Sequence, residues 1–165
     1  MVAISAKHGS QTVSSVQLPN IVIIFIVAFV SNTVIHALRL SPGDDLKASL
    51  AEYCKQRQIA AATIVSCVGS LSKLHLRLAS ATKFLQRSAL FEIVSLVGTL
   101  SPDGVHLHLS AADDSGAVWG GHLMEGNIVH TTAEIIIMEL MDYQFQRVFD
   151  AATGYKELLI CANET

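Results

Sequence analysis

Apolar and polar positions alternate along much of the chain after residue 32, and this pattern predicts a largely β structure. A period of two is typical of strands that bury one face. We predict strands at residues 33–40, 60–68, 74–81, 91–100, 105–112, 117–120, 127–140 and 155–161. Residues 143–149 suit either a last short strand or a helix.

One segment has helical spacing instead. Within residues 45–58, the apolar side chains of Leu46, Leu50 and Tyr53 recur at intervals that place them on one helix face. Asp44 follows a Ser-Pro-Gly turn and is the predicted N-cap. The elements together predict an α+β fold, with a strongly curved, mainly antiparallel sheet and one or two packed helices.

Glycines and turn residues mark the expected ends and irregularities of these strands. Gly69 is predicted to end the strand at 60–68, and Gly98 to form a β-bulge. Residues 102–104 (Pro-Asp-Gly) predict a hairpin turn. A second turn is predicted at residues 113–116 (Asp-Asp-Ser-Gly).

The N-terminal part differs from the rest. Residues 21–30 are ten apolar residues without a charge, whereas a membrane-spanning helix needs about 20. This length suits a signal-peptide core, an extra buried strand or an unstructured extension, and residues 1–20 are predicted to be a disordered tail. We therefore divide the chain into an extension (1–32) and a domain (33–162). We expect a cytoplasmic or nuclear protein, with secretion or anchoring through 21–30 as the alternative.

Composition adds an expectation about assembly. Hydrophobic residues make up 51% of the 165-residue chain and charged residues only 15%, against about 25% in an ordinary soluble domain. This balance favours burial of apolar surface between subunits over insertion into a membrane. The net charge of −3 and the small basic cluster at 55–57 argue against direct DNA binding. Cys54, Cys67 and Cys161 lack disulfide or zinc-knuckle spacing, and we expect the first two in the core.

Three histidines are the candidate chemistry. His106 and His108 would project from the same face of one strand, about 6–7 Å apart, and His122 could join them after the turn at 113–116. Neutral imidazoles with an open coordination position suit Zn²⁺ or another divalent metal. The alternative is a set of hydrogen-bonded histidines lining a cleft between subunits.

Other polar residues are weighed against this cluster. Glu134 and Glu92 lie in apolar runs, where a carboxylate is costly to bury without a partner. Each could accept a hydrogen bond from a metal-binding histidine and orient its ring. Alternatively, each could pair with a positive charge, as Glu134 could with Arg77. His130 is a fourth candidate for the cluster, whereas we interpret His36 and His75 as ordinary strand residues without partners.

Glycine and tryptophan residues near the histidines have structural interpretations. Gly120 and Gly121 predict a positive φ or the close approach of another chain segment. They form neither GxGxxG nor a P-loop, so we expect no nucleotide cofactor. Trp119 is expected in the core or an interface rather than stacked on a ligand.

Several segments in a fixed order resemble a known family. They are residues 40–46 (LSPGDDL), 66–71 (SCVGSL), 76–77 (LR), 91–100 (FEIVSLVGTL), the histidine segments, 132–134 (TAE) and 153–158 (TGYKEL). Together, over residues 33–160, they resemble the plant and prokaryote conserved (PPC) domain. The resemblance implies a compact domain built on an antiparallel sheet that assembles as a homotrimer.

The family's plant members imply functions that this sequence does not match. In land plants the domain follows AT-hooks that bind DNA, but this chain has no Arg-Gly-Arg-Pro core. The plant partner-binding segment Gly-Arg-Phe-Glu-Ile-Leu corresponds to residues 89–94 here, where the glycine and arginine are absent. The histidine segments match instead the stand-alone bacterial and archaeal members, which carry a DNA-binding label by association.

Three functions remain open from the sequence. The first is a homotrimeric binding or interaction module, with a divalent metal at its histidine cluster and a protein partner besides itself. The second is a metal-dependent enzyme that acts on a small molecule at a subunit interface. The third is a DNA-associated regulator that acts through a partner. The sequence identifies neither a catalytic residue nor a substrate.

Overall fold

The computed structural model describes residues 32–163. The predictions for residues 1–31, including the apolar segment 21–30, lie outside this range. The elements, in chain order, are β1 (Thr33–Leu40), α1 (Leu46–Arg57), β2 (Ala62–Arg77), β3 (Phe84–Ser101), β4 (Gly104–Ala112), β5 (Val118–Leu123), β6 (Ile128–Leu140), β7 (Tyr143–Asp150) and β8 (Tyr155–Ala162). No helix in the described part is long and apolar enough to cross a membrane.

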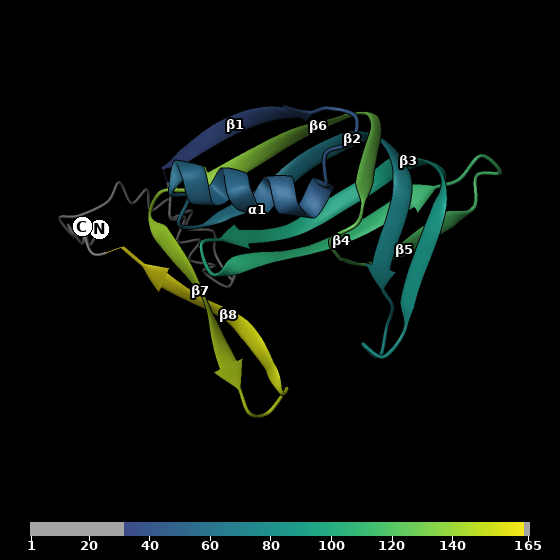
Figure 1. Ribbon diagram of the computed structural model, residues 1–165. Coiled ribbons are helices and arrows are strands. Elements are labelled where there is room, and N and C mark those ends of the chain that lie inside the picture. The colour runs from purple at the N-terminus through teal and green to yellow at the C-terminus, as the bar shows by residue number, and fades with distance from the viewer. Residues whose placement is uncertain (1–31, 164–165) are drawn as a thin grey trace, which may run out of the picture. The chain divides into compact units, whose positions relative to one another are not determined.

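The strands form one large sheet and one separate hairpin (Figure 1). The six-stranded sheet has the order β1-β6-β2-β3-β4-β5, and all of its pairings are antiparallel. β7 and β8 pair only with each other. This arrangement, with α1 as the one helix among residues 32–163, confirms the predicted α+β fold with a curved antiparallel sheet.

The sheet closes on itself at one end. β5 pairs with β4 and also with the end of β2, where Leu76 lies opposite Leu123 and Arg77 opposite His122. A sheet can meet its own edge only when it is strongly curved. The closure places the C-terminal end of β2 directly beside the strand that carries His122.

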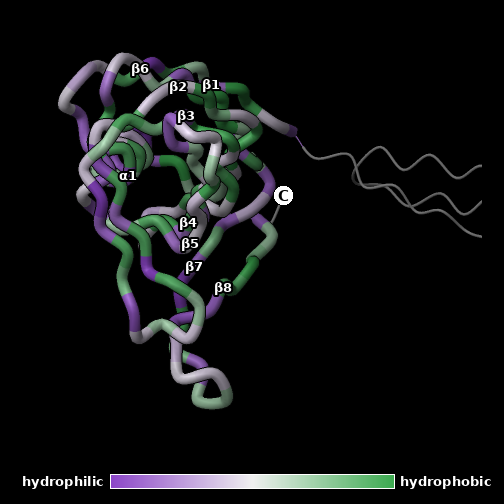
Figure 2. The backbone as a smooth tube through the Cα atoms, turned by 90° about the vertical axis from the view of Figure 1, so that its right-hand side faces the viewer, coloured by the Kyte–Doolittle hydropathy of each residue, from purple (hydrophilic) through white to green (hydrophobic). Residues whose placement is uncertain are grey.

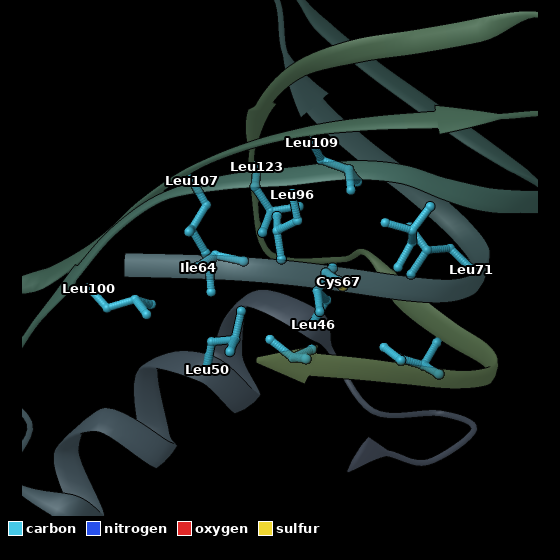
Figure 3. Close-up of a cluster of buried hydrophobic side chains, with 14 of the residues drawn as sticks. Leu46, Leu50, Ile64, Cys67, Leu71, Leu96, Leu100, Leu107, Leu109 and Leu123 are labelled. Atoms are coloured by element: carbon cyan, nitrogen blue, oxygen red, sulfur yellow. The ribbon is translucent and has the colours of Figure 1, made fainter. Parts of the chain in front are cut away.

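Helix α1 covers the concave side of the sheet and completes the core. Its three buried side chains are Leu46, Leu50 and Cys54. Figure 3 shows Leu46 and Leu50 directed toward the strands, where they face apolar side chains of the sheet. Cys67 is also buried, so the expectation that Cys54 and Cys67 are small core residues is confirmed.

The helix begins one residue later than predicted. Asp45, not Asp44, is the N-cap: its carboxylate accepts a hydrogen bond from the backbone N–H of Ala48. Asp44 instead accepts from the backbone N–H of Ser41 within the preceding turn. The helix ends at Arg57 and is capped by Gln58, whose left-handed conformation lets its N–H donate to backbone oxygens of the last turn.

Two predicted strand boundaries are wrong. Residues 62–68 and 74–77 belong to one strand, β2, which continues through Gly69, whereas residues 60–61 and 78–81 lie outside it. Gly69 has a φ of +143°, and a Cβ there would lie 2.1 Å from the backbone oxygen of Thr132. The glycine therefore permits the close approach of β6 and does not end the strand.

The strand predicted at 91–100 is also longer in the structure. β3 begins at Phe84. The prediction missed residues 84–90 because all but Leu85 are exposed and the segment does not alternate between apolar and polar residues. Its irregular pairing with β4 lies between Ile93 and Ser95, whereas Gly98 pairs in register with Leu107. The predicted bulge at Gly98 is therefore wrong. The predicted turn at 102–104 is confirmed, since β3 ends at Ser101 and β4 begins at Gly104.

The closure makes a prediction about two adjacent glycines. A Cβ at Gly121 would lie 2.7 Å from the backbone oxygen of Arg77, while one at Gly120 would meet only Ser110 Oγ at 3.1 Å and more distant atoms. We expect Gly121→Ala to lower the free energy of unfolding by about 1–3 kcal/mol, and Gly120→Ala to lower it clearly less. Denaturant unfolding measures both values, and equal effects of the two variants would contradict the tight contact between β5 and β2.

Candidate metal centre

The three predicted histidines come together on β4 and β5. His106 and His108 alternate along β4 and therefore project from the same face. His108 lies directly opposite His122 in the β4–β5 ladder, which places the third imidazole on that face as well. The local sequence and the strand pairing thus produce the convergence together.

The distances within this histidine cluster suit a small ion after modest rotation of the rings. The ring centroids are 5.2 Å apart for His106 and His108, 5.0 Å for His106 and His122, and 5.6 Å for His108 and His122. One nitrogen from each ring lies within 4.8 Å of the others. Three nitrogens bound to one tetrahedral Zn²⁺ at about 2.0–2.1 Å would be roughly 3.3 Å apart, which side-chain rotation can achieve.

One atom of this cluster fits a bound metal particularly well. Nδ1 of His122 is buried and has no hydrogen-bond partner among the described residues. A buried polar atom without a partner costs about 1–3 kcal/mol. A metal ion bound to Nδ1 of His122 would give this atom a partner and so offset that cost.

The electrostatic surroundings keep two of the rings neutral. Burial lowers the pKa of His122 to about 4, with a further contribution from the positive charge of Arg77. Burial also lowers the pKa of His106, and the guanidinium of Arg147 acts in the same direction. At neutral pH both rings therefore carry a free lone pair, which is the form that binds metals.

A cavity of about 850 Å³ opens beside the histidines. Its walls come from four parts of the fold: the end of β2 with the loop after it, the β3–β4 turn, strands β4 and β5, and the β7–β8 hairpin. The hairpin contributes Arg147, Tyr155, Lys156 and Glu157. Arg77, Arg147 and Lys156 were not identified as site residues from the sequence, because nothing in their local sequences links them to β4 and β5.

The turn between β4 and β5 is fixed by one carboxylate. Asp113 accepts hydrogen bonds from Ser115, from the backbone of Ala117 and from Nε1 of Trp119. Hydrogen bonds from the Ser115 and Trp119 side chains lower the pKa of Asp113 to about 2. The ring of Trp119 also packs under the guanidinium of Arg87, 3.8 Å from its centroid, in line with its expected structural role. The turn thereby holds the register that sets His108 opposite His122.

The two glutamates weighed with the cluster lie elsewhere. Glu92 is five residues along β3 from Val97, which faces His108, a separation of about 17 Å along the strand. Glu134 is exposed on β6, where Val68 and Arg39 lie opposite it. Among residues 32–163, the structure records no hydrogen bond or ion pair for either carboxylate. The suggested partner of Glu134, Arg77, instead lies opposite His122.

The remaining histidines are also outside the cluster. His130 is exposed on β6 and does not belong to the cluster of His106, His108 and His122. His36, expected to lack a partner, bonds through Nδ1 to the hydroxyl of Tyr53 and through Nε2 to Glu139, at 3.0 and 2.9 Å. His75, expected to be unpartnered as well, lies 2.6 Å through Nδ1 from the backbone oxygen of Glu125. The sequence analysis missed these contacts because each one joins segments that are far apart in the chain.

Comparison with known proteins identifies the family of this chain. A model of the Plants and Prokaryotes Conserved (PCC) domain matches residues 28–141. The chain belongs to this family. It is the family, written PPC above, that the sequence resembles, so that expectation is confirmed.

Solved structures of PCC-domain and related proteins share the fold. A hypothetical protein from Salmonella enterica is 40% identical, with a TM-score of 0.79 over 82% of this chain and 98% of its own. A plant- and prokaryote-conserved protein from Pyrococcus horikoshii is 26% identical, with a TM-score of 0.67 over 81% and 97%. A metal-containing protein from Archaeoglobus fulgidus is also 26% identical, with a TM-score of 0.65 over 80% and 98%.

Curated relatives of this PCC-domain chain are larger proteins. Two bifunctional GlmU proteins from Synechococcus strains are 48% and 49% identical over 126 residues. The match covers 76% of this chain but only 20% of each relative. The chain therefore spans about a fifth of the length of those proteins.

The lowered pKa of His122 predicts a pH dependence of the metal-free protein. A histidine that titrates near 6.5 when unfolded and at about 4 when folded binds more protons in the unfolded state between these values. Its contribution to the free energy of unfolding is therefore present above pH 6.5 and decreases as the pH falls toward about 4. We expect His122→Gln to flatten this dependence in chelator-treated protein, as measured by denaturant unfolding across that range. His130→Gln, at an exposed position, should keep the wild-type slope, and a wild-type slope in His122→Gln would contradict the prediction.

Proposed function

We propose that this PCC-domain protein is a homotrimeric binding module that holds a divalent metal, Zn²⁺ or a similar ion, at His106, His108 and His122. The observation that carries the proposal is the convergence of three ring nitrogens within 4.8 Å, one of the rings having a buried Nδ1 without a partner. The metal-containing relative from Archaeoglobus fulgidus supports it. When bound, the metal would supply a Lewis-acidic centre facing the cavity.

Exposed apolar surface supports the trimer. Val65 and Val68 on β2 and Val94 and Val97 on β3 are each more than half exposed, with values from 54% to 58%. Neighbouring strands thus present an apolar surface on the side of the sheet that α1 does not cover. Surfaces of this kind are typical of protein interfaces, and a second copy of the chain is the occupant we propose.

The β7–β8 hairpin adds a second apolar surface. Phe145 anchors the hairpin, since its side chain is buried and its N–H donates to the backbone oxygen of Ala60. Farther along, Phe149 and Ile160 are exposed, and part of β8 is hydrophobic in Figure 2. A two-stranded hairpin is at best marginally stable in water on its own. Packing against a neighbouring subunit would stabilise it.

A metal-dependent enzyme is the second candidate. The specific observation in its favour is the cavity of about 850 Å³ that opens directly at the histidines, a volume within the range of small-molecule sites. Three protein ligands also leave a fourth coordination position for water or substrate, as in catalytic zinc sites. The module and the enzyme share the same metal site and differ in whether a bound molecule reacts.

The metal proposal predicts the metal content of untagged protein. We expect stoichiometric divalent metal in the wild type, at isolation or after incubation with Zn²⁺. The double variant His106→Ala/His108→Ala should lose it, because one imidazole cannot hold the ion alone. His130→Ala is the matched control and should bind metal like the wild type. Elemental analysis measures all three, and a wild type without metal after incubation would overturn the proposal.

The trimer proposal predicts a mass in solution of about 53 kDa, three times the 17.7 kDa of one chain. Placing charges on the apolar surface, as in Val65→Asp/Val94→Asp, should shift the protein toward monomer, because an unpaired charge is costly to bury in an interface. Ala48→Asp, on the exposed side of α1, should leave the mass unchanged. Analytical ultracentrifugation distinguishes these states, and a monomeric wild type at micromolar concentration would refute the proposal.

A further inference from the structure

The cavity beside the histidines carries an excess of positive charge that the chain as a whole does not have. Its lining includes the cations Arg77, Arg147 and Lys156 against the carboxylates Asp103 and Glu157. The full chain, in contrast, has a net charge of −3. Local positive charge in a hollow surface attracts anions and raises their local concentration.

Arg77 stands on one side of the histidine cluster. It is the last residue of β2 and lies directly opposite His122 where the sheet closes. Residues opposite each other in an antiparallel pair project from the same face. Arg77 is half-buried, and it lines the cavity. A charge in this position interacts with a ligand more strongly than a freely exposed one.

Arg147 stands on the other side and is held in place. Its Nη2 donates a hydrogen bond of 2.7 Å to Thr99 Oγ1, and Thr99 lies directly opposite His106 in the β3–β4 ladder. That is its one side-chain hydrogen bond in the described part of the chain. A guanidinium carries several N–H donors, so the others remain for a ligand. Two arginines thus flank the three histidines from different strands.

The carboxylates of the cavity have other partners. Asp103 accepts a hydrogen bond from the backbone N–H of Arg147, at 3.2 Å. Glu157 accepts from the hydroxyl of Thr153, at 2.8 Å. Neither carboxylate forms an ion pair with Arg77 or with the guanidinium of Arg147 among residues 32–163. The two guanidiniums are therefore available for an external anion.

We propose that the cavity binds a small molecule with a carboxylate or phosphate group, which pairs with Arg77 and Arg147 while the rest of the molecule faces the histidine cluster. Arginine binds both groups through paired N–H donors. The volume of about 850 Å³ also far exceeds the roughly 30 Å³ of a single water, so a metal and its waters leave space for such a ligand. The inference rests on the proposed metal-binding function in one respect, that the ligand faces a metal at the histidines. Recognition of the anionic group by the arginines does not depend on the metal.

The test measures binding of three probes of similar size: phenyl phosphate, benzoate and the neutral benzyl alcohol. Isothermal titration calorimetry would use the full chain, both metal-free and loaded with Zn²⁺, with metal content determined on the same samples. We expect phenyl phosphate, benzoate or both to bind more tightly than benzyl alcohol. The preferred anion identifies which oxyacid group the site recognises.

Variants assign the binding to the two arginines. Arg77→Gln and Arg147→Gln should each weaken anion binding about tenfold, the effect of one lost charge-assisted hydrogen bond. Arg77→Lys keeps the charge and should retain part of the affinity. This result would show that the loss in Arg77→Gln comes from the missing charge and not from a folding defect. Lys55→Gln removes a charge from the exposed end of α1 and should bind like the wild type.

The outcomes separate this inference from the metal proposal. If metal binds but neither anion is preferred over benzyl alcohol, the inference is overturned and the metal site stands. The inference also fails if both glutamine variants bind anions like the wild type. If no metal binds, the metal proposal fails, and the titrations of the metal-free protein and its arginine variants decide the inference alone.

Discussion

The pairing of β5 with both β4 and β2 is the constraint on which the candidate site depends. It joins the edge strand β5 to the C-terminal end of β2 through Leu76–Leu123 and Arg77–His122, and Gly121 permits the close contact because a side chain there would meet the backbone of Arg77. Without this closure, His108 and His122 would still face each other across β4 and β5. The histidine cluster would then lack Arg77 and the loop after β2, which form the adjoining wall of the cavity.

The closure also explains the electrostatics of the site. It brings a guanidinium next to His122, and the β7–β8 hairpin brings a second one near His106. Burial and these positive charges together hold the pKa of both rings below the ordinary value. The same neighbours that keep the imidazoles neutral attract negative charge to the cavity. A metal site at the histidines and an anion site at the arginines would thus occupy one cavity without conflict, because an anion offsets the repulsion between a bound cation and the arginines.

The alternation of side chains was sufficient to find most strands, and it failed where both faces of a strand share one environment. β1 and β4 were predicted close to their observed bounds because apolar and polar residues alternate over much of their length. β6 was also predicted close to its bounds, from its Ile and Thr content. The first part of β3 is exposed except at Leu85 and shows no alternation of apolar and polar residues. Gly69 resembled a strand end, although it marks a place where β6 comes too close for any side chain.

The sequence by itself determined the fold class, the family and the three histidines. The fold class and the histidines depend on local spacing: period two along strands, helical spacing along α1, and a His-x-His pair on one strand face. The family depends on several short segments that occur in a fixed order along the chain. Only the tertiary structure decided which residues surround those histidines. Arg77 and Arg147 lie far from them along the chain and reach them through sheet closure and hairpin packing. The two glutamates in apolar runs were attractive partners by sequence, yet strand register placed them well away from the cluster. Spacing along a strand fixes which face a side chain occupies, but contacts between distant strands follow from register and curvature, which no local pattern encodes.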